Sequence, residues 1–333
     1  MEMMPVVVLL LTVLLSGLGE RPRPRPVRPV PLNAPSLCIE TFNLNYARAG
    51  SPETLRALES SPADVLLLQE TNRAWQALVQ PRLSARYPHQ IWVERPHAGG
   101  QAVLSRQPLR ESQILPSPVG WFPALRFVAE TPLGPVQLLA VHLHPPITDD
   151  GSWIRGFFFT DAPRLAEVKK YAAALRPQQP TLIAGDFNED TSGQALRFLL
   201  ERGFRSALPE FAPDAPTWHW QVGGLELLLQ LDHLLYDASL EPLRAEVVPV
   251  GRSDHWPVRA SFVRAAPGAE RPPQPPLPLL SVRLPGVRSA AHAPVEPLKP
   301  RRGELLKHSR GEPLGPRRGE PQRDGAGREL LAH

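Results

Sequence analysis

Short stretches of alternating apolar and polar residues, and short runs of apolar residues, recur through the middle of the chain. Alternation with a period of two is typical of a strand with one buried face, whereas a short apolar run is typical of a strand buried on both faces. These patterns predict about ten strands, at Leu37 to Leu44, Val65 to Gln69, Gln90 to Val93, Gln101 to Ser105, Ala124 to Ala129, Val136 to Leu143, Thr181 to Ala184, Leu229 to Tyr236, Glu246 to Val250 and Pro257 to Val263.

Helical patterns separate these strands. The clearest helix starts after Ser51, because a serine N-cap followed by proline at the first helical position is a common way to begin a helix. The expected helices are Pro52 to Ser60, Asn72 to Leu78, Ala162 to Leu175 and Ser192 to Glu201. Strands and helices in this arrangement predict an α/β domain with large sheets flanked by helices.

The two ends of the chain differ in composition from this middle part. Residues 20–35 form a Pro/Arg-rich linker, which we expect to be a stiff spacer, and 13 of the 42 prolines lie between Pro267 and Pro321. We therefore expect a folded domain at residues 36–264 and a disordered Pro/Arg-rich tail at residues 265–333. The domain is long enough to form a sizeable core.

An apolar run from Val6 to Leu18 dominates residues 1–19. It resembles the core of a signal peptide and is short for a membrane span. The arginines of the linker follow this run, a distribution that by the positive-inside rule would keep the downstream chain in the cytoplasm. We expect a signal peptide or a membrane anchor, hence an exported or membrane-associated protein tethered by its N-terminus. A cytoplasmic-facing anchor is the alternative.

The net charge of +4 is unevenly distributed along the chain. Residues 35–264 carry 21 basic and 24 acidic side chains, so the positive excess lies in the two ends. Charge therefore gives no argument for a nucleic-acid groove in the folded part.

The single cysteine, Cys38, excludes an intramolecular disulfide and a multi-cysteine zinc site. We expect a monomer.

Polar side chains gather where the predicted strands end, which is where α/β folds collect functional groups. They are carboxylates, amides and imidazoles: Asn43, Asn45, Glu70, His142, His144, Asp186, Asn188, Asp232, His233, Asp254 and His255. Each residue alone could be a turn former or a cap, but the set is typical of a hard cation with acid–base groups beside it. We expect Mg²⁺ or Mn²⁺ rather than zinc. Strand alternation turns His144 and His233 away from the other groups, so we expect them to pack or cap.

Six short motifs contain these residues. They are Thr-Phe-Asn-Leu-Asn at 41–45, Leu-Leu-Leu-Gln-Glu at 66–70, Val-His-Leu at 141–143, Gly-Asp-Phe-Asn at 185–188, Leu-Asp-His at 231–233 and Ser-Asp-His-Trp-Pro-Val at 253–258. Their order resembles that of the endonuclease/exonuclease/phosphatase superfamily, and most of all its bacterial members with an apolar N-terminus. The resemblance spans Ser36 to Val263. It implies the deoxyribonuclease I-like fold, a four-layer α/β/β/α sandwich.

The resemblance also implies hydrolysis at phosphorus in a single step. Glu70 would coordinate the metal ion, with Asn45 as a weaker second polar group and Asp254 beside it. Asp186 would orient or deprotonate the attacking water, and Asn188 would help to place that water.

A second group of residues would act on the phosphate. His255 would contact the phosphate or take a proton, while Asp232 fixes its tautomer and raises its pKa. Asn43 and His142 would donate hydrogen bonds to the phosphoryl oxygens as negative charge develops. Whether Asp186 or the His255–Asp232 pair is the base stays open at this point.

The motifs do not specify the substrate. Nucleases bring basic or aromatic residues to their substrate, so the candidates for substrate binding are Arg106, Trp121, Trp153 and Trp218. The same tryptophans could simply pack their loops.

Three functions are therefore compatible with the sequence. The leading hypothesis is a divalent-metal-dependent endonuclease or exonuclease that cleaves nucleic-acid phosphodiesters with an activated water. The alternative is a phosphodiesterase or phosphatase that acts on a phospholipid headgroup or on a sugar or inositol phosphate. The third is a catalytically inactive partner-binding module, which the intact set of acidic and histidine residues argues against.

Overall fold

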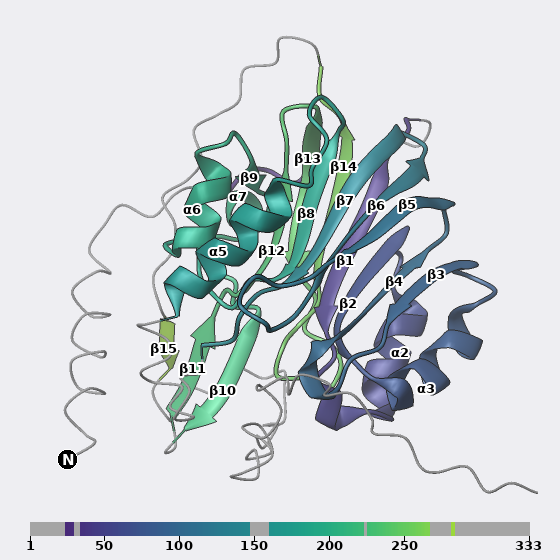
Figure 1. Ribbon diagram of the computed structural model, residues 1–333, viewed down its shortest axis with the longest axis vertical. Coiled ribbons are helices and arrows are strands. Elements are labelled where there is room, and N and C mark those ends of the chain that lie inside the picture. Colours follow the sequence, from purple (N-terminus) through teal and green to yellow (C-terminus); the bar gives the residue numbers. More distant parts are fainter. Residues whose placement is uncertain (1–23, 30–33, 147–159, 223–224, 267–280, 284–333) are drawn as a thin grey trace, which may run out of the picture. The chain divides into compact units, whose positions relative to one another are not determined.

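The computed structural model describes residues 24–29, 34–146, 160–222, 225–266 and 281–283, all within one unit of the chain, residues 1–298 (Figure 1). These residues form two six-stranded sheets and one three-stranded sheet. Among them, none of the helices is both long and apolar enough to cross a membrane. The apolar run of residues 6–18 lies outside the described residues.

The first sheet has the strand order β13-β14-β1-β2-β4-β3. Its strands are β1 Leu37–Asn43, β2 Val65–Thr71, β3 His89–Val93, β4 Gly100–Ser105, β13 Leu240–Val247 and β14 Val258–Arg264. Only β1 and β2 are parallel neighbours in this sheet. The apolar run of β2 is buried on both faces, because Val65 and Leu67 face the second sheet while Leu66 and Leu68 pack under helices.

The second sheet has the strand order β5-β6-β7-β8-β12-β9. Its strands are β5 Leu109–Leu115, β6 Ala124–Thr131, β7 Gly134–His142, β8 Thr181–Asp186, β9 Arg205–Ser206 and β12 Asp232–Tyr236. Here β7 and β8 are the parallel pair. Each large sheet therefore has one parallel pair at its centre.

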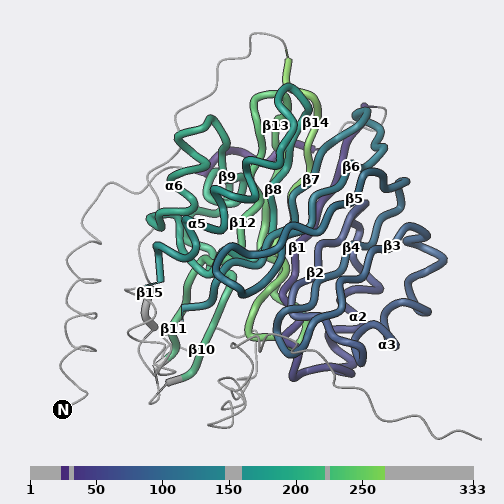
Figure 2. The backbone as a smooth tube through the Cα atoms, in the orientation of Figure 1, coloured from purple at the N-terminus to yellow at the C-terminus, as the bar shows by residue number. Residues whose placement is uncertain are grey.

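The helices are α2 Pro52–Ser60, α3 Arg73–Leu83, α5 Asp161–Ala172, α6 Gln194–Leu200 and α7 Leu208–Phe211, with short 3₁₀ turns η1 Tyr46–Arg48 and η2 His97–Gly99. Helices α2 and α3 cover the outer face of the first sheet, α5 and α6 cover the outer face of the second, and the two inner faces pack together with α7 at their core (Figure 2). As expected, the Ser51 side chain caps α2 by accepting from the Thr54 N–H. The expected four-layer α/β/β/α sandwich is confirmed.

Several strands differ from the sequence-based expectation. β13 begins at Leu240, six residues before the expected strand, and β5 was not expected because its residues are mostly exposed and polar. The expected strand from Leu229 to Tyr236 is divided between β12 and a separate strand, β11 Leu225–Leu229. β11 belongs to the small sheet, whose order is β10-β11-β15, with β10 Trp218–Val222 and β15 Ser281–Arg283.

β15 lies within the segment expected to be disordered. It pairs antiparallel with β11, with Val282 opposite Leu227. These three residues have backbone partners in a sheet, which the sequence pattern did not predict. Residues 267–280 and 284–333 lie outside the described residues.

Residues 24–29 of the Pro/Arg-rich linker, called the strap below, contact the domain. The Arg25 N–H donates to the Glu210 carbonyl at 2.6 Å, and the Arg28 N–H donates to the Leu243 carbonyl at 2.9 Å. Arg25 also forms ion pairs with Glu210 at 3.1 Å and with Glu241 at 2.7 Å. The sequence indicated a stiff spacer and did not predict these contacts with the domain.

Candidate active site

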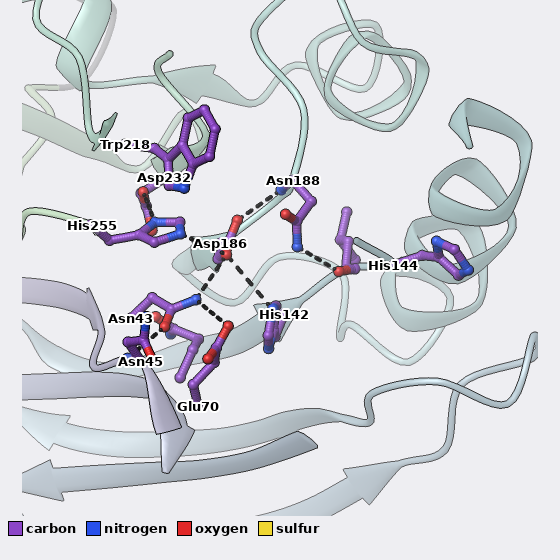
Figure 3. A network of polar contacts seen from close by, with 12 residues as sticks. Asn43, Asn45, Glu70, His142, His144, Asp186, Asn188, Trp218, Asp232 and His255 are labelled. Atoms are coloured by element: carbon purple, nitrogen blue, oxygen red, sulfur yellow. Dashed lines mark hydrogen bonds and ion pairs between the residues drawn. The ribbon is translucent and has the colours of Figure 1, made fainter. Parts of the chain in front are cut away.

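The two parallel strand pairs bring their carboxyl ends to one place. Asn43 ends β1 and Glu70 lies near the end of β2, while His142 and Asp186 end β7 and β8. Because neighbouring parallel strands end at the same edge of a sheet, each pair delivers two polar groups together. The two edges meet where Asn43 Nδ2 donates to Asp186 Oδ2 at 3.0 Å (Figure 3).

Gly185 lets Asp186 lie at this edge. Its φ is +147°, and a Cβ at this position would lie 1.9 Å from the carbonyl oxygen of Val141 on the neighbouring strand β7. Only glycine avoids this overlap. The glycine of the Gly-Asp-Phe-Asn motif thus allows β7 and β8 to pair closely, with His142 directly beside Asp186 in the register.

A bulge places Glu70. The pairing of β2 with β4 shifts register between Gln69 and Thr71, and Glu70 has a φ of +54°. A bulge turns a side chain out of the regular alternation of a strand, which re-aims it. Glu70 Oε1 accepts from Asn43 Nδ2 at 3.2 Å, and Oε2 accepts from the Tyr46 N–H at 3.2 Å.

Asp186 is the centre of the polar network (Figure 3). Besides the Asn43 amide, two imidazole nitrogens approach its Oδ2, His142 Nε2 and His255 Nε2, each at 3.6 Å. Its Oδ1 accepts from the Asn188 N–H at 2.8 Å. Burial raises the pKa of Asp186, while the nearby His255 acts to lower it.

His255 and Asp232 form a hydrogen-bonded pair, with 2.8 Å between Nδ1 and Oδ2. Asp232 lies on β12 directly opposite Asp186, and the His255 N–H donates to Ser253 Oγ. Burial alone would lower the pKa of His255, but Asp232 and Asp186 raise it well above its usual value because they favour the imidazolium. Asp232 therefore favours an imidazolium at His255, beside Asp186.

A second acidic side chain, Asp254, lies near Glu70. Asp254 Oδ1 accepts from Asn45 Nδ2 at 2.9 Å, and its Oδ2 accepts from Trp218 Nε1 at 3.2 Å. Burial and the like charge of Asp254 raise the pKa of Glu70 to about 7. Burial also disfavours ionised Asp254, but His255 and these hydrogen bonds hold its pKa below its usual value.

These carboxylates fit a divalent cation. Glu70 and Asp254 are oxygen donors whose mutual repulsion a cation would relieve, and the buried Asp232 Oδ1 has no hydrogen-bond partner among the described residues. Ligand atoms of Asp186, Asp232 and His255 also lie within 4.8 Å of one another, but an imidazolium at His255 has no lone pair for a metal ion. Asn45 is placed differently from the expectation, because its Oδ1 accepts from the Ala47 N–H and it presents a donor to Asp254. It therefore orients the Asp254 carboxylate.

His142 and Asn188 also contact residues that are not part of the polar network around Asp186. The ring of Phe122 stacks on His142 with 4.1 Å between centroids, and burial lowers the pKa of His142 to about 4. A neutral imidazole results. Asn188 Nδ2 donates to the Leu143 carbonyl at 2.9 Å, so this amide joins the segments that follow β7 and β8.

The comparisons with known proteins agree with this geometry. The sequence profile of the endonuclease/exonuclease/phosphatase family matches residues 41–255, from the first motif to His255. The chain belongs to this family. Members of the endonuclease/exonuclease/phosphatase family are phosphoester hydrolases, and the residues above could hold the divalent metal typical of it. A search of curated proteins finds no match.

Solved structures of the endonuclease/exonuclease/phosphatase fold superpose on the chain. A family member from Beutenbergia cavernae is 19% identical, with a TM-score of 0.57, over 69% of this chain and 72% of the other. TDP2 from D. rerio, in complex with a single-strand DNA product, is 16% identical, with a TM-score of 0.56, over 68% and 98%. A 3'-5' exonuclease from Neisseria meningitidis is 20% identical, with a TM-score of 0.54, over 68% and 100%. At these identities the likeness shows the fold alone.

The structure brings only some of the expected substrate-binding residues to this site. Trp218 contacts Asp254, and Trp121 packs beside His144, with 4.5 Å between ring centroids. Arg106 follows Ser105, the last residue of β4, which pairs with Val65 at the start of β2. Glu70 lies near the other end of β2, so Arg106 is distant from the site. Its guanidinium faces Asp64 and Tyr87. The expectation for Arg106 is corrected accordingly. Trp153 lies outside the described residues.

His144 and His233 are turned away from the centre. Strand alternation explains this for His233, which directly follows Asp232 on β12, but not for His144, which lies two residues after His142 and beyond the end of β7. His144 Nδ1 contacts the Pro145 carbonyl, and His233 Nε2 contacts the Glu189 carbonyl at 3.0 Å. A set of supporting residues was not predicted from the sequence: Ser117, Phe122, Arg164, Glu167 and Glu189. Glu189 directly follows the Gly-Asp-Phe-Asn motif, which is a usable signal. The others have none, since an arginine or glutamate on a helix normally indicates an exposed face.

Proposed function

We propose that this protein is a divalent-metal-dependent phosphodiesterase that cleaves nucleic-acid phosphodiesters by attack of an activated water. The observation that carries the proposal is the convergence of Asn43, His142 and His255 on one oxygen of Asp186, next to the Glu70–Asp254 carboxylates. Donors for a phosphate, an acid–base group and cation ligands therefore meet in one buried centre.

The charge pattern supports a division of roles between Asp186 and His255. His255 would already carry a proton and could not take another, whereas burial raises the pKa of Asp186, so Asp186 would orient and deprotonate the water. His255, kept as an imidazolium by Asp232, would bind a phosphoryl oxygen. Asn43 and neutral His142 would donate to the other oxygens. Asn188 would fix Asp186 through its backbone N–H.

The same geometry supports Glu70 and Asp254 as the groups that hold Mg²⁺ or Mn²⁺. When bound, such a cation neutralises charge that develops on the phosphoryl group. Asn45 and Trp218 would fix the orientation of Asp254 through their hydrogen bonds.

Nucleic acid is supported as the substrate class by two partly exposed tryptophans, because indole rings can stack on bases. Trp218 contacts Asp254, and Trp121 packs against Phe122, whose ring stacks on His142. Two similar structures are described as an exonuclease and as a complex with a DNA product. The slight acidic excess of residues 35–264 favours the second candidate, a hydrolase of a phospholipid headgroup or a small phosphoester.

A parallel assay of the full chain separates these candidates. Plasmid DNA, single-stranded RNA, bis-p-nitrophenyl phosphate and sphingomyelin vesicles would be incubated with Mg²⁺ or with EDTA. We expect Mg²⁺-dependent cleavage of the nucleic acids, about 100-fold or more slower in His255→Ala and in Glu70→Gln, with the Mg²⁺ requirement of Glu70→Gln moved to higher concentration.

The control variant is His89→Ala, at the start of β3 and opposite Ser105, far from the site. It should retain wild-type rates. Turnover of the small diester or the lipid alone would replace the nuclease proposal with the second candidate. No turnover of any substrate would contradict both.

A further inference from the structure

Arg164 lies in the first turn of α5 and is buried, with 2% of its side chain exposed. Its guanidinium donates through Nε to Glu189 Oε2 at 3.0 Å and through its terminal nitrogens to Thr160 Oγ1 and Asp161 Oδ1, both at 2.6 Å. A weaker contact reaches the His144 carbonyl at 3.5 Å. One side chain of α5 therefore contacts the segments that follow both β7 and β8.

Glu189 completes this link on the β8 side. Its second oxygen, Oε1, accepts from the Leu196 N–H in the first turn of α6 at 2.6 Å. Its backbone carbonyl contacts His233 Nε2 on β12. Glu189 is thus fixed to α5, α6 and β12, one residue after Asn188.

A matching contact exists on the β7 side. Glu167, one turn after Arg164 on α5, accepts through Oε2 from the His144 N–H at 2.7 Å and through Oε1 from Ser117 Oγ at 2.7 Å. His144 is therefore held at its N–H by Glu167 and at its carbonyl by Arg164. It lies two residues after His142, whose ring approaches Asp186.

A buried ion pair is weak support for stability, because the cost of removing two charges from water offsets their attraction. Its fixed geometry, however, can hold attached segments in one arrangement. Here those segments carry Asp186, Asn188 and His142, and Asn188 has a left-handed φ of +51° that its surroundings must maintain.

We propose that Arg164 and Glu189 form a positioning pair that fixes the segments after β7 and β8, so that His142, Asp186 and Asn188 keep the arrangement needed for hydrolysis. The proposal rests on the proposed function of this site. Neither residue of the positioning pair touches the reacting atoms, and they act through the segments they hold.

Gly193 offers a way to disturb the positioning pair without removing a charge. It precedes α6 with an ordinary φ of −64°, which alanine can adopt. A Cβ at this position would lie 2.2 Å from the Glu189 carboxyl carbon. Gly193→Ala should therefore displace the Glu189 carboxylate while leaving both ionised groups in the chain.

The test compares Gly193→Ala and Glu189→Gln with Glu40→Gln in the full chain. Glu40 is the matched control, a carboxylate 2% exposed that accepts from Arg259 in another buried ion pair, on the first sheet. The substrate is bis-p-nitrophenyl phosphate with Mg²⁺, and each variant is assayed below its melting temperature. We expect kcat to fall about 10- to 100-fold in Gly193→Ala and in Glu189→Gln, while KM stays within about twofold of the wild-type value. Glu40→Gln should lose stability and keep its kcat.

Hydrogen exchange gives a readout that does not depend on activity. We expect peptides containing residues 143–144 and 186–190 to exchange faster in Gly193→Ala and in Glu189→Gln, but not in Glu40→Gln. Unchanged kcat and unchanged exchange in Gly193→Ala and Glu189→Gln would overturn the positioning role. An inactive wild-type protein would instead contradict the proposed function, and the exchange data would still decide on the pair.

Discussion

Three residues of the site have left-handed backbone conformations that non-glycine residues rarely adopt. The φ angles are +57° for Asn45, +54° for Glu70 and +51° for Asn188. Asparagine tolerates this region, but for glutamate it is unusual and costs energy. Hydrogen bonds offset the strain, for example from Tyr46 N–H to the Glu70 carboxylate. At this scale, the chain gives up some stability to aim the side chains that carry the proposed chemistry.

Buried neutral histidine makes stability depend on pH. Burial lowers the pKa of His233 to about 4, from an ordinary value of 6.5. Between these values the unfolded chain binds the proton more readily, so the free energy of unfolding falls as the pH falls. His233→Asn should therefore reduce the loss of stability between pH 7 and pH 5 by about 2 kcal/mol.

Chemical denaturation at both pH values, in EDTA so that metal binding does not contribute, measures this difference. His89→Asn, which replaces a partly exposed histidine, is the control and should leave the pH difference as in the wild type. An equal pH difference in His233→Asn and the wild type would contradict the assignment of His233 as a buried neutral group.

At the scale of elements, the strap shows how a segment without a core of its own becomes ordered. Arg25 and Arg28 both reach Glu241, at 2.7 and 2.5 Å, and Arg25 lies over the ring of Phe211. Two backbone hydrogen bonds add to these contacts. The strap binds next to β13, an edge strand of the first sheet, and so covers part of an edge that would otherwise be open.

We expect Arg25→Gln to lower the melting temperature by about 2–4 °C, since an ion pair of this kind contributes about 1 kcal/mol. The difference from the wild type should shrink in 1 M salt, which screens charges. Arg56→Gln, which removes an exposed ion pair with Glu53, is the control and should shift the melting temperature less. A salt-independent difference for Arg25→Gln would show that charge does not hold the strap.

At the scale of the whole molecule, the site exists only where the two sheets pack together. The first sheet supplies Asn43 and Glu70, and the second supplies His142 and Asp186. His255 comes from the segment before β14, and its backbone pairs with that of Trp218 at the start of β10. The small sheet is thus connected to the site, and β15 is connected to the small sheet.

Two truncations test this organisation. A chain ending at residue 283 retains every described element, so we expect its melting temperature to stay within about 2 °C of the full chain. A chain ending at residue 266 also loses β15, and should show faster hydrogen exchange in β11. Equal exchange in the two truncated chains would show that β15 does not stabilise β11, and a large loss of stability in the longer one would place a structural role beyond residue 283.

The sequence by itself determined the α/β class, most strands, and the polar residues at strand ends that meet in the site. These features follow from local patterns, because apolar periodicity reports which face of an element is buried and parallel strands end together. The motifs at residues 41–45, 66–70, 185–188 and 253–258 each adjoin an apolar run, and that run alone is enough to place them at strand ends.

Only the tertiary structure decided which of these residues touch, and which other residues support them. Asn43 and Asp186 are 143 positions apart, yet share a hydrogen bond. The bulge that aims Glu70, the distance of Arg106 from the site and the burial of Arg164 depend on partners from other elements. Periodicity carries no information about such partners, because a charged residue has the same local pattern whether it is exposed or neutralised by a distant carboxylate.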